Sequence, residues 1–364
     1  MSESVDSAGR PGGEARGQDV QDVQDVQEQE QARVEDQGAA AAEAATSGWR
    51  SRLSGVGEIR NIGLVLVLVV LAIIGVATSE NFATTDNLRN ILVSASVVGV
   101  VSVGMTFVII GGGIDLSVGA IVALASVWAT TLATQSYGPW VMILCALAVG
   151  AGTGLVNGLL IAYGRLVPFI VTLAMLVSAR GLAARMANNR TQLVTQQRIK
   201  QIATADVVGV PVLVIVLAVV AVVGWLLLNR TTFGRRTIAI GGNAEAARLA
   251  GIDVKRTTAT LYLLSGICCG IAAVMIIART TTGSSTHGNL YELQAIAAVI
   301  IGGTLLSGGR GTIVGSILGV LVFQTITNIF VLNNLATEVQ NIANGLIIVA
   351  AVLLQRRATR DVST

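Results

Sequence analysis

The chain has 364 residues, of which 53% are hydrophobic and only 12% are charged. This composition excludes an ordinary soluble domain and is typical of a protein that crosses a membrane several times. The net charge of +3 conceals an acidic beginning, because residues 1–48 contain eleven acidic residues and three arginines. In the rest of the chain the basic residues fall in loops between apolar runs, a pattern that membrane topology explains better than nucleic-acid binding.

Residues 1–48 form a low-complexity segment in which the triplet QDV occurs three times from Gln18 onward. Large apolar residues are almost absent from it, so it cannot bury a core, and we expect a disordered or transiently helical acidic tail. Its acidic start differs from the basic beginning of a signal peptide. A regulatory role and a dispensable tail both fit this composition.

Residues 49–364 are predicted to form one transmembrane domain. A spanning helix needs about 20 mostly apolar residues. Ten segments approach this length: 61–78, 89–110, 117–134, 140–162, 169–188, 210–228, 258–279, 292–307, 312–333 and 339–355. The predicted fold is therefore an all-α, polytopic membrane protein with about ten transmembrane helices.

The arginines and lysines of the short loops predict the orientation, because cytoplasmic loops carry an excess of them. Those assigned to the cytoplasm are Arg50, Arg52 and Arg60 before the first span, six residues in the segment 229–257, and Arg356, Arg357 and Arg360 after the last span. Both termini are thus expected in the cytoplasm of a bacterial plasma (inner) membrane protein. The external loop 189–209 also carries three basic residues, so the rule is not obeyed cleanly.

Glycines recur at four-residue spacing in two of the apolar segments. One run is Gly150, Gly154 and Gly158, and the other is Gly311, Gly315 and Gly319. Each run lines one helix face with hydrogen atoms and predicts close packing against another helix.

Several kinds of site are not expected. The three cysteines lie in apolar runs without metal-ligand spacing, and His287 is the single histidine, so we expect no metal, no disulfide framework and no bound cofactor. Neither lysine, Lys200 or Lys255, follows a glycine, so the chain cannot carry a nucleotide-binding P-loop. If transport is driven by ATP, the ATPase must be another polypeptide.

The polar stretch "GGNAEAARLAGID", residues 241–253, predicts a short helix over about 241–252. Asn243 can cap its beginning, Glu245 falls in its first turn, and Gly251 follows its end. A helix this short is marginal alone in water, so it must pack on something. Its small apolar face, Ala246, Leu249 and Ala250, can pack on the chain's own bundle or enter a groove of a cytoplasmic partner.

Two glycine-interrupted segments, 104–120 and 301–312, stand in the two halves of the chain, and both breaks fall on the predicted cytoplasmic side. Such breaks point to a translocation pathway or its gate. Asp115, beside the first break, either caps the next helix, pairs with an arginine, or acts directly in transport. Arg310 is either part of the gate or a positively charged anchor. The residues assigned to pathway or gate are Phe107, Gly112, Gly113, Asp115, Ser117, Gln294, Gly302, Gly303, Ser307 and Arg310.

Four stretches together resemble the ribose/xylose-type permease subunits of ATP-binding-cassette sugar importers, within the branched-chain amino acid/sugar permease superfamily. They are "GMTFVIIGGGIDLSVGA", "NGLLIAYGRLVPFIVTLAMLVSARGLA", "FGRRTIAIGGNAEAARLAGI" and "ELQAIAAVIIGGTLLSGGRGT". They occur in the family's order over about residues 85–355. The chain departs from the family at Gly111, where threonine is common, and at Gln294, where aspartate often follows "YEL".

The resemblance implies a transport subunit and no enzyme. It implies that a monosaccharide such as ribose, delivered by an extracytoplasmic binding protein, crosses the membrane through two copies of the chain or through a pair formed with a close relative. It further implies that the short helix presents an EAA-like motif to a cytoplasmic ATPase, which binds the ATP. The residues so assigned are Asn243, Glu245, Ala246, Ala247, Arg248, Leu249 and Gly251. The alternatives are a permease for nucleosides or other polar solutes and, from a different class, an ion-coupled secondary transporter that uses Asp115.

Overall fold

The computed structural model describes residues 61–360. The predicted acidic tail, residues 1–48, and the three arginines that follow it lie outside the described residues.

Seven helices among the described residues are long and apolar enough to cross a membrane. They are Asn61–Thr78, α2 (Thr85–Ile110), α5 (Pro139–Ala162), α6 (Pro168–Met186), α8 (Val212–Arg230), α11 (Val254–Thr280) and α13 (Ile313–Leu332). The other three predicted segments fall on two shorter helices, α3 (Val118–Ala129) and α12 (Tyr291–Ile301), and on the last helix, α14 (Thr337–Arg360). The all-helical membrane fold is confirmed, whereas the count of ten full spans stays a prediction.

The third and eighth predicted segments are shorter than the sequence suggested. The third, 117–134, divides into α3 and the small helix α4 (Leu132–Ser136), for which Thr131 provides the N-cap. The eighth, 292–307, ends as a helix at Ile301, and Gly303 then takes a left-handed φ of 80°. Apolar residues continue past the ends of α3 and α12, so a count of apolar residues could not locate these ends.

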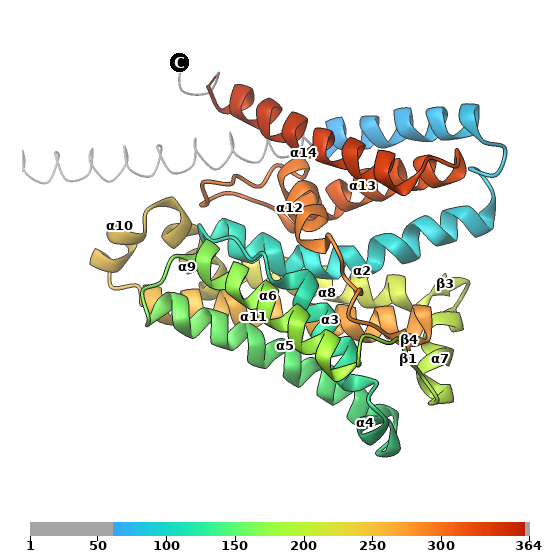
Figure 1. The fold of residues 1–364 in the computed structure, drawn as a ribbon. Helices are drawn as coiled ribbons and strands as arrows, with labels where there is room; N and C mark the ends of the chain where they lie inside the picture. Colours follow the sequence, from blue (N-terminus) through green and yellow to red (C-terminus); the bar gives the residue numbers. More distant parts are fainter. Residues whose placement is uncertain (1–60, 361–364) are drawn as a thin grey trace, which may run out of the picture. The chain divides into compact units, whose positions relative to one another are not determined.

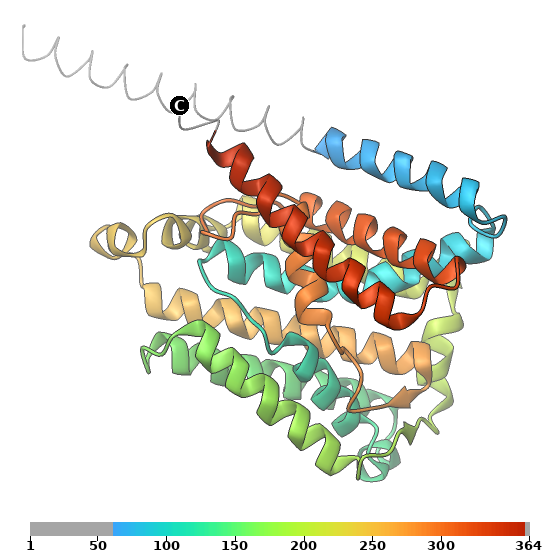
Figure 2. The same ribbon diagram turned by 45° about the horizontal axis from the view of Figure 1, so that its top comes forward.

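Helices α2 and α11 form the centre of the bundle. In their most apolar windows 89% and 72% of the residues are buried, against 11% for Asn61–Thr78 and 22% for α6 and α8. Valines and small residues such as Gly99, Ser102 and Gly104 alternate along the buried part of α2, and neighbouring helices pack around it on several sides. Figures 1 and 2 show α5 lying along α11, the most extensive helix pair of the fold.

The predicted glycine faces are where helix backbones touch. A Cβ atom at Gly154 would collide with the carbonyl oxygen of Tyr262 and lie 2.9 Å from the Cα of Gly266, so α5 and α11 meet without intervening side chains. In the second run, Gly315 and Gly319 of α13 pack in the same way against the backbone of α12. The first run and the Gly315–Gly319 part of the second are therefore helix interfaces, as their spacing predicted, whereas Gly311 precedes α13 and lies outside its face.

Polar side chains join α2 to α13 at two levels. Asn87 and Asn328 exchange amide hydrogen bonds of 3.0 and 2.7 Å. The hydroxyl of Thr106 donates to that of Ser316 at 2.8 Å. Within lipid, such pairs satisfy groups that have no access to water.

The two ends of the bundle differ in structure (Figure 1). At the α10 end lie α9 (Thr232–Gly242) and α10 (Ala244–Leu249). At the opposite β end lie α4, α7 (Gln197–Thr204), and four two-residue strands: β1 (Gln192–Leu193), β2 (Asp206–Val207), β3 (Val210–Pro211) and β4 (Thr282–Gly283). The antiparallel pair β1–β4, with Gln192 opposite Gly283, ties the segment after α6 to the segment after α11, and β2 pairs with β3.

The α5–α11 contact predicts a position-specific effect on folding. Gly154→Leu should prevent native packing, because overpacking costs about 1–3 kcal/mol even where side chains can yield, and here backbone atoms block the site. Gly152→Leu is the matched control, since Gly152 is exposed on the same helix with no atom within 4 Å of a Cβ there. Size-exclusion profiles and thermal unfolding in detergent measure the difference. Equal behaviour of the two variants would show that this interface does not depend on glycine.

Candidate functional site

The predicted short helix exists and is capped as expected, but it is shorter than 241–252. The side-chain oxygen of Asn243 accepts the N–H groups of Glu245 and Ala246, both at 3.0 Å. Gly251, just past the end, has a φ of 81° that favours glycine. Gly241 and Gly242 are the last residues of α9, so α10 proper runs from Ala244 to Leu249.

One residue of α10 faces the protein and the others face outward. Ala247 is 5% exposed, so its methyl group packs on the chain itself. Leu249 is 75% exposed, and Ala246 is also exposed.

Glu245 and Arg248 form an exposed ion pair on α10. Arg248 donates from Nη2 to Oε1 at 2.5 Å and from Nε to Oε2 at 3.0 Å. These bonds lower the pKa of Glu245, so the carboxylate is charged at neutral pH. Such an exposed pair contributes little stability, and its two charges remain available at the rim of a contact surface.

Helix α9 connects α10 to the centre of the bundle. It packs on α2, α8 and α11, whereas α10 packs mainly on α9 and the beginning of α11. The ring of Phe233 on α9 lies 6.0 Å from the ring of Phe107 on α2. Phe107, assigned to the pathway from the sequence, is fully buried in this aromatic contact and is a packing residue here.

The first glycine break holds Asp115 in a closed hydrogen-bond network. Ser117 donates its backbone N–H and its hydroxyl to Asp115 Oδ1 at 3.0 and 2.5 Å, and the Ser265 hydroxyl of α11 donates to Oδ2 at 2.9 Å. The amide nitrogen of Asn157 on α5 donates to the Ser117 hydroxyl at 2.9 Å. All four residues are fully buried.

This network makes Asp115 the acceptor of a turn that precedes α3. The carboxylate accepts the N–H two residues ahead, the geometry of an Asx turn, and the N-cap of α3 is Ser117, which makes no side-chain cap bond. Within the described residues no lysine or arginine forms an ion pair with it. Its side chain joins three helices and does not lie on an open surface.

The second break is a longer glycine-rich turn. Gly302 ends α12 and packs against the backbone at Gly315, while Gly303 is left-handed. Ser307 and Arg310 are exposed at the α10 end. This position of Arg310 fits both a gate residue and a positively charged anchor. Gln294 is half-buried near the other end of α12, away from this group of predicted pathway residues.

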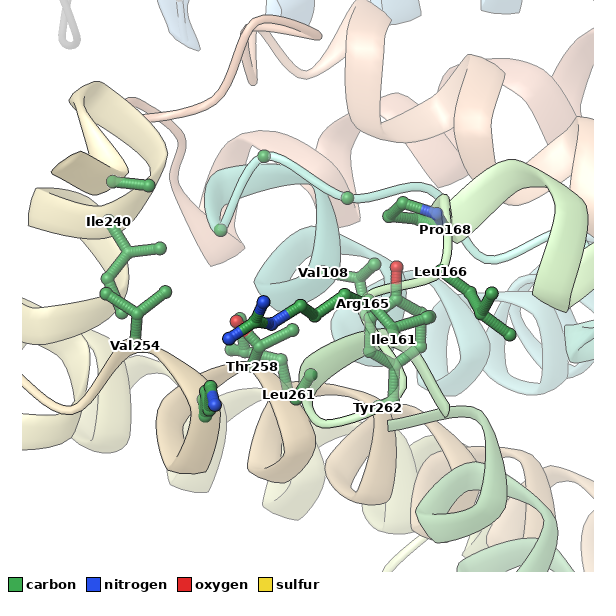
Figure 3. A pocket seen from close by; sticks show the side chains of 16 residues that line it. Val108, Ile161, Arg165, Leu166, Pro168, Ile240, Val254, Thr258, Leu261 and Tyr262 are labelled. Atoms are coloured by element: carbon green, nitrogen blue, oxygen red, sulfur yellow. The ribbon is translucent and has the colours of Figure 1, made fainter. Parts of the chain in front are cut away.

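A pocket of about 320 Å³ opens beside the first break (Figure 3). Its walls come from Gly111–Gly113, the α5–α6 loop, the α9–α10 junction and the first turns of α11. Arg165 and Lys255 are its two cations, and none of the described residues that line it is acidic. Figure 3 shows the Arg165 side chain extending across the pocket toward Thr258. Sequence reasoning missed this pocket, because its walls come from four separate segments.

At the β end, side chains fasten the loops that follow α6 and α11. Arg180 of α6 donates to the carbonyl oxygens of Ser285 and His287 at 2.7 and 2.9 Å. Gln135 donates to the Leu193 carbonyl at 3.0 Å. Burial lowers the pKa of His287 to about 4, so the ring is uncharged at neutral pH.

Comparisons with known proteins agree on one family. Residues 87–352 match the family described as the permease component of the branched-chain amino acid transport system. The chain is 39% identical over 303 residues to the ribose import permease protein of Bacillus subtilis (strain 168), covering 83% of this chain and 94% of that protein. It is 37% identical over 298 residues to the ribose import permease protein of Escherichia coli (strain K12), covering 81% and 92%. It is 36% identical over 308 residues to the L-arabinose ABC transporter permease protein of Azospirillum brasilense, covering 83% and 91%. No solved structure matches the chain.

The Asp115 network predicts which substitutions the fold tolerates. Asp115→Leu should lower the unfolding temperature strongly, because each buried donor that loses its acceptor costs about 1–3 kcal/mol. Asp115→Asn should remain close to wild type, since the amide oxygen still accepts from Ser117 and an unpaired buried charge is removed. Thermal unfolding in detergent compares them, with Asp206→Asn of the partly exposed Arg89 pair as the control. If Asn destabilises as much as Leu, the negative charge itself is required and the interpretation of Asp115 as a turn acceptor is wrong.

Proposed function

The chain belongs to the family of branched-chain amino acid transport system permease components, as the permease subunit of an ATP-binding-cassette sugar importer, and from this premise we propose that its cargo is a pentose, ribose before L-arabinose. It is a multi-pass membrane protein and a transport subunit, with no catalytic role of its own. The observation that supports the pentose is the agreement of relatives that are matched over more than 90% of their length and are named for ribose and L-arabinose.

The aromatic residues of the spans support a non-specific pathway. Phe107, Tyr262 and Phe323 are buried against neighbouring helices, so their ring faces are not free to stack on a sugar. Trp128 and Trp225 are partly exposed, and Trp225 lies under the guanidinium of Arg230 at 5.5 Å. We therefore assign the choice of cargo mainly to an extracytoplasmic binding protein that docks at the β end.

We place the docking site of the ATPase on α10. An isolated helix of six residues is not stable in water, and Ala247 anchors this one while Leu249 projects outward. Leu249 would enter an apolar groove of the ATPase, and the Glu245–Arg248 pair would lie at the rim. Arg235, Arg236, Arg248, Lys255 and Arg256 gather at this end of the bundle, which supports placing it, with both termini, in the cytoplasm.

In the proposed cycle the permease works as two copies with two ATPase subunits or one double ATPase. ATP binds to the ATPase and to no site on this chain. Its binding brings the ATPase units together and displaces α10, which changes the side of the membrane to which the central cavity opens. The displacement is effective only if α10 makes different contacts in the two states of the bundle.

Two alternatives remain distinct from this proposal. A nucleoside permease of the same class would differ only in cargo. An ion-coupled transporter would need an acid that binds protons or sodium, and Asp115 already accepts three hydrogen bonds within the chain. It would also leave the exposed Leu249 without a role.

The cargo is tested by uptake in cells that lack other pentose importers and express the permease with its ATPase and binding protein. Uptake of labelled ribose should be saturable, and unlabelled ribose should inhibit it more strongly than L-arabinose or a nucleoside does. The uptake should continue in the presence of a protonophore and stop when ATP is depleted. Stronger inhibition by the nucleoside would show that the cargo is a nucleoside and not a pentose. Loss of uptake in the presence of the protonophore at constant ATP would show that transport is ion-coupled and not driven by ATP.

Docking on α10 is tested with Leu249→Glu. Full burial of a leucine contributes about 1.5–3 kcal/mol, so the variant should bind the ATPase at least roughly tenfold more weakly and lose sugar uptake to a similar extent. Leu193→Glu is the matched control for ATPase recovery alone, because Leu193 is 71% exposed at the opposite end of the bundle, where the binding protein is proposed to dock. Co-purification from detergent-solubilised membranes gives the readout. Undiminished ATPase recovery with Leu249→Glu would remove α10 from the interface.

A further inference from the structure

Three segments that are distant in the sequence meet backbone to backbone at the α10 end. They are the first break, the end of α9, and the turn between α12 and α13. We call their contact the glycine junction, formed by Gly112, Gly241, Gly308 and Gly309. One hydrogen bond crosses it, from the N–H of Gly309 to the carbonyl oxygen of Ile110, the last residue of α2, at 2.8 Å.

At Gly241 and Gly308 the junction has no room for a side chain. A Cβ at Gly241 would collide with the carbonyl oxygen of Ile110 and lie 2.5 Å from the nitrogen of Gly309. A Cβ at Gly308 would lie 2.7 Å from the oxygen of Gly241 and 3.0 Å from the Cα of Gly112. Main-chain atoms in direct contact cannot yield as the end of a flexible side chain can, so a displacement of one segment must displace the others.

The end of α9 contacts the junction on one side and lines the pocket with a buried side chain on the other. Gly241 lies in the junction, whereas the side chain of the preceding residue, Ile240, lines the 320 Å³ pocket (Figure 3). Asn243, two residues after Gly241, is the cap of α10. A force on α10 is therefore applied next to the glycine contact, and the pocket provides space into which the chain can move.

We propose that the glycine junction transmits the displacement of α10 to both helix breaks at once, and that Gly241 is the positioning residue of this coupling. The proposal rests on the docking of the ATPase at α10. It explains why the two breaks, far apart in the sequence, lie together at this end: both contact the segment that leads to α10. The short helices α3 and α12 each adjoin one of the two breaks, so a shift of the junction is passed to both helices.

The chain contains a matched pair of positions for the test. Gly241 and Gly242 are consecutive residues of α9, and neither has a left-handed φ, so alanine suits the helix at both. A Cβ at Gly242 meets no atom within 4 Å, whereas one at Gly241 meets two other segments. Alanine at the two positions therefore differs in the junction contact alone.

The experiment compares Gly241→Ala and Gly242→Ala in the complete transporter in proteoliposomes. Thermal stability, ATPase recovery, ATP hydrolysis and sugar uptake are measured for both. Gly241→Ala should bind and stimulate the ATPase yet move about tenfold less sugar per ATP, the scale of a typical coupling free energy. Gly242→Ala should keep the wild-type ratio. A wild-type ratio in a stable Gly241→Ala protein overturns the proposal, because a purely structural glycine alters stability and not this ratio.

A wild-type measurement covers the case in which Gly241→Ala does not fold. Hydrogen–deuterium exchange of the complete transporter is recorded with and without a non-hydrolysable ATP analogue. The amides of 110–113, 240–243 and 307–310 should change protection together. A change confined to 240–243 overturns the junction while leaving the docking intact. Failure of the wild-type chain to recover any ATPase defeats the docking as well, so the two failures are distinguishable.

Discussion

Direct contact between helix backbones is the constraint on which the rest of this structure depends. Lipid is as apolar as a leucine side chain, so helices in a membrane gain little from the hydrophobic effect when they associate, and close packing takes its place. The glycines of α5 at positions 150, 154 and 158 bring this helix against the backbone of α11, whose Gly266 and Gly270 contribute the facing surface.

That contact determines where the buried polar groups meet. Asn157 stands between Gly154 and Gly158 on α5, and Ser265 precedes Gly266 on α11, so the same approach that joins the helices brings both side chains to the turn before α3. There they complete the network around Asp115. The carboxylate thus acts as a joint among α3, α5 and α11, and its burial follows from the glycine packing.

The two ends of the bundle are fastened by different means. At the β end, long side chains reach backbone carbonyl groups, as Arg180 and Gln135 do, and strand pairing adds main-chain bonds. At the α10 end, glycine backbones touch directly beside an open pocket. The first arrangement fastens loops through side chains, whereas the second holds segments together through close main-chain contact beside a pocket.

The sequence alone determined the class of protein, the approximate position of its long apolar helices, the cap at Asn243, the turn at Gly251 and the glycine faces, because each depends on residues close together in the chain. It did not predict the short helices α4, α7 and α9. The resemblance carried by four separated motifs identified the family, which the comparisons confirmed. The lengths of α3 and α12 could not be predicted, since apolar composition continues past their ends. Only the tertiary structure decided that Phe107 is a packing residue, that Ala247 faces inward and Leu249 outward, and that three glycine segments meet. These outcomes depend on which distant segments become neighbours, and in a chain of uniformly apolar helices the local pattern contains almost no information about that choice.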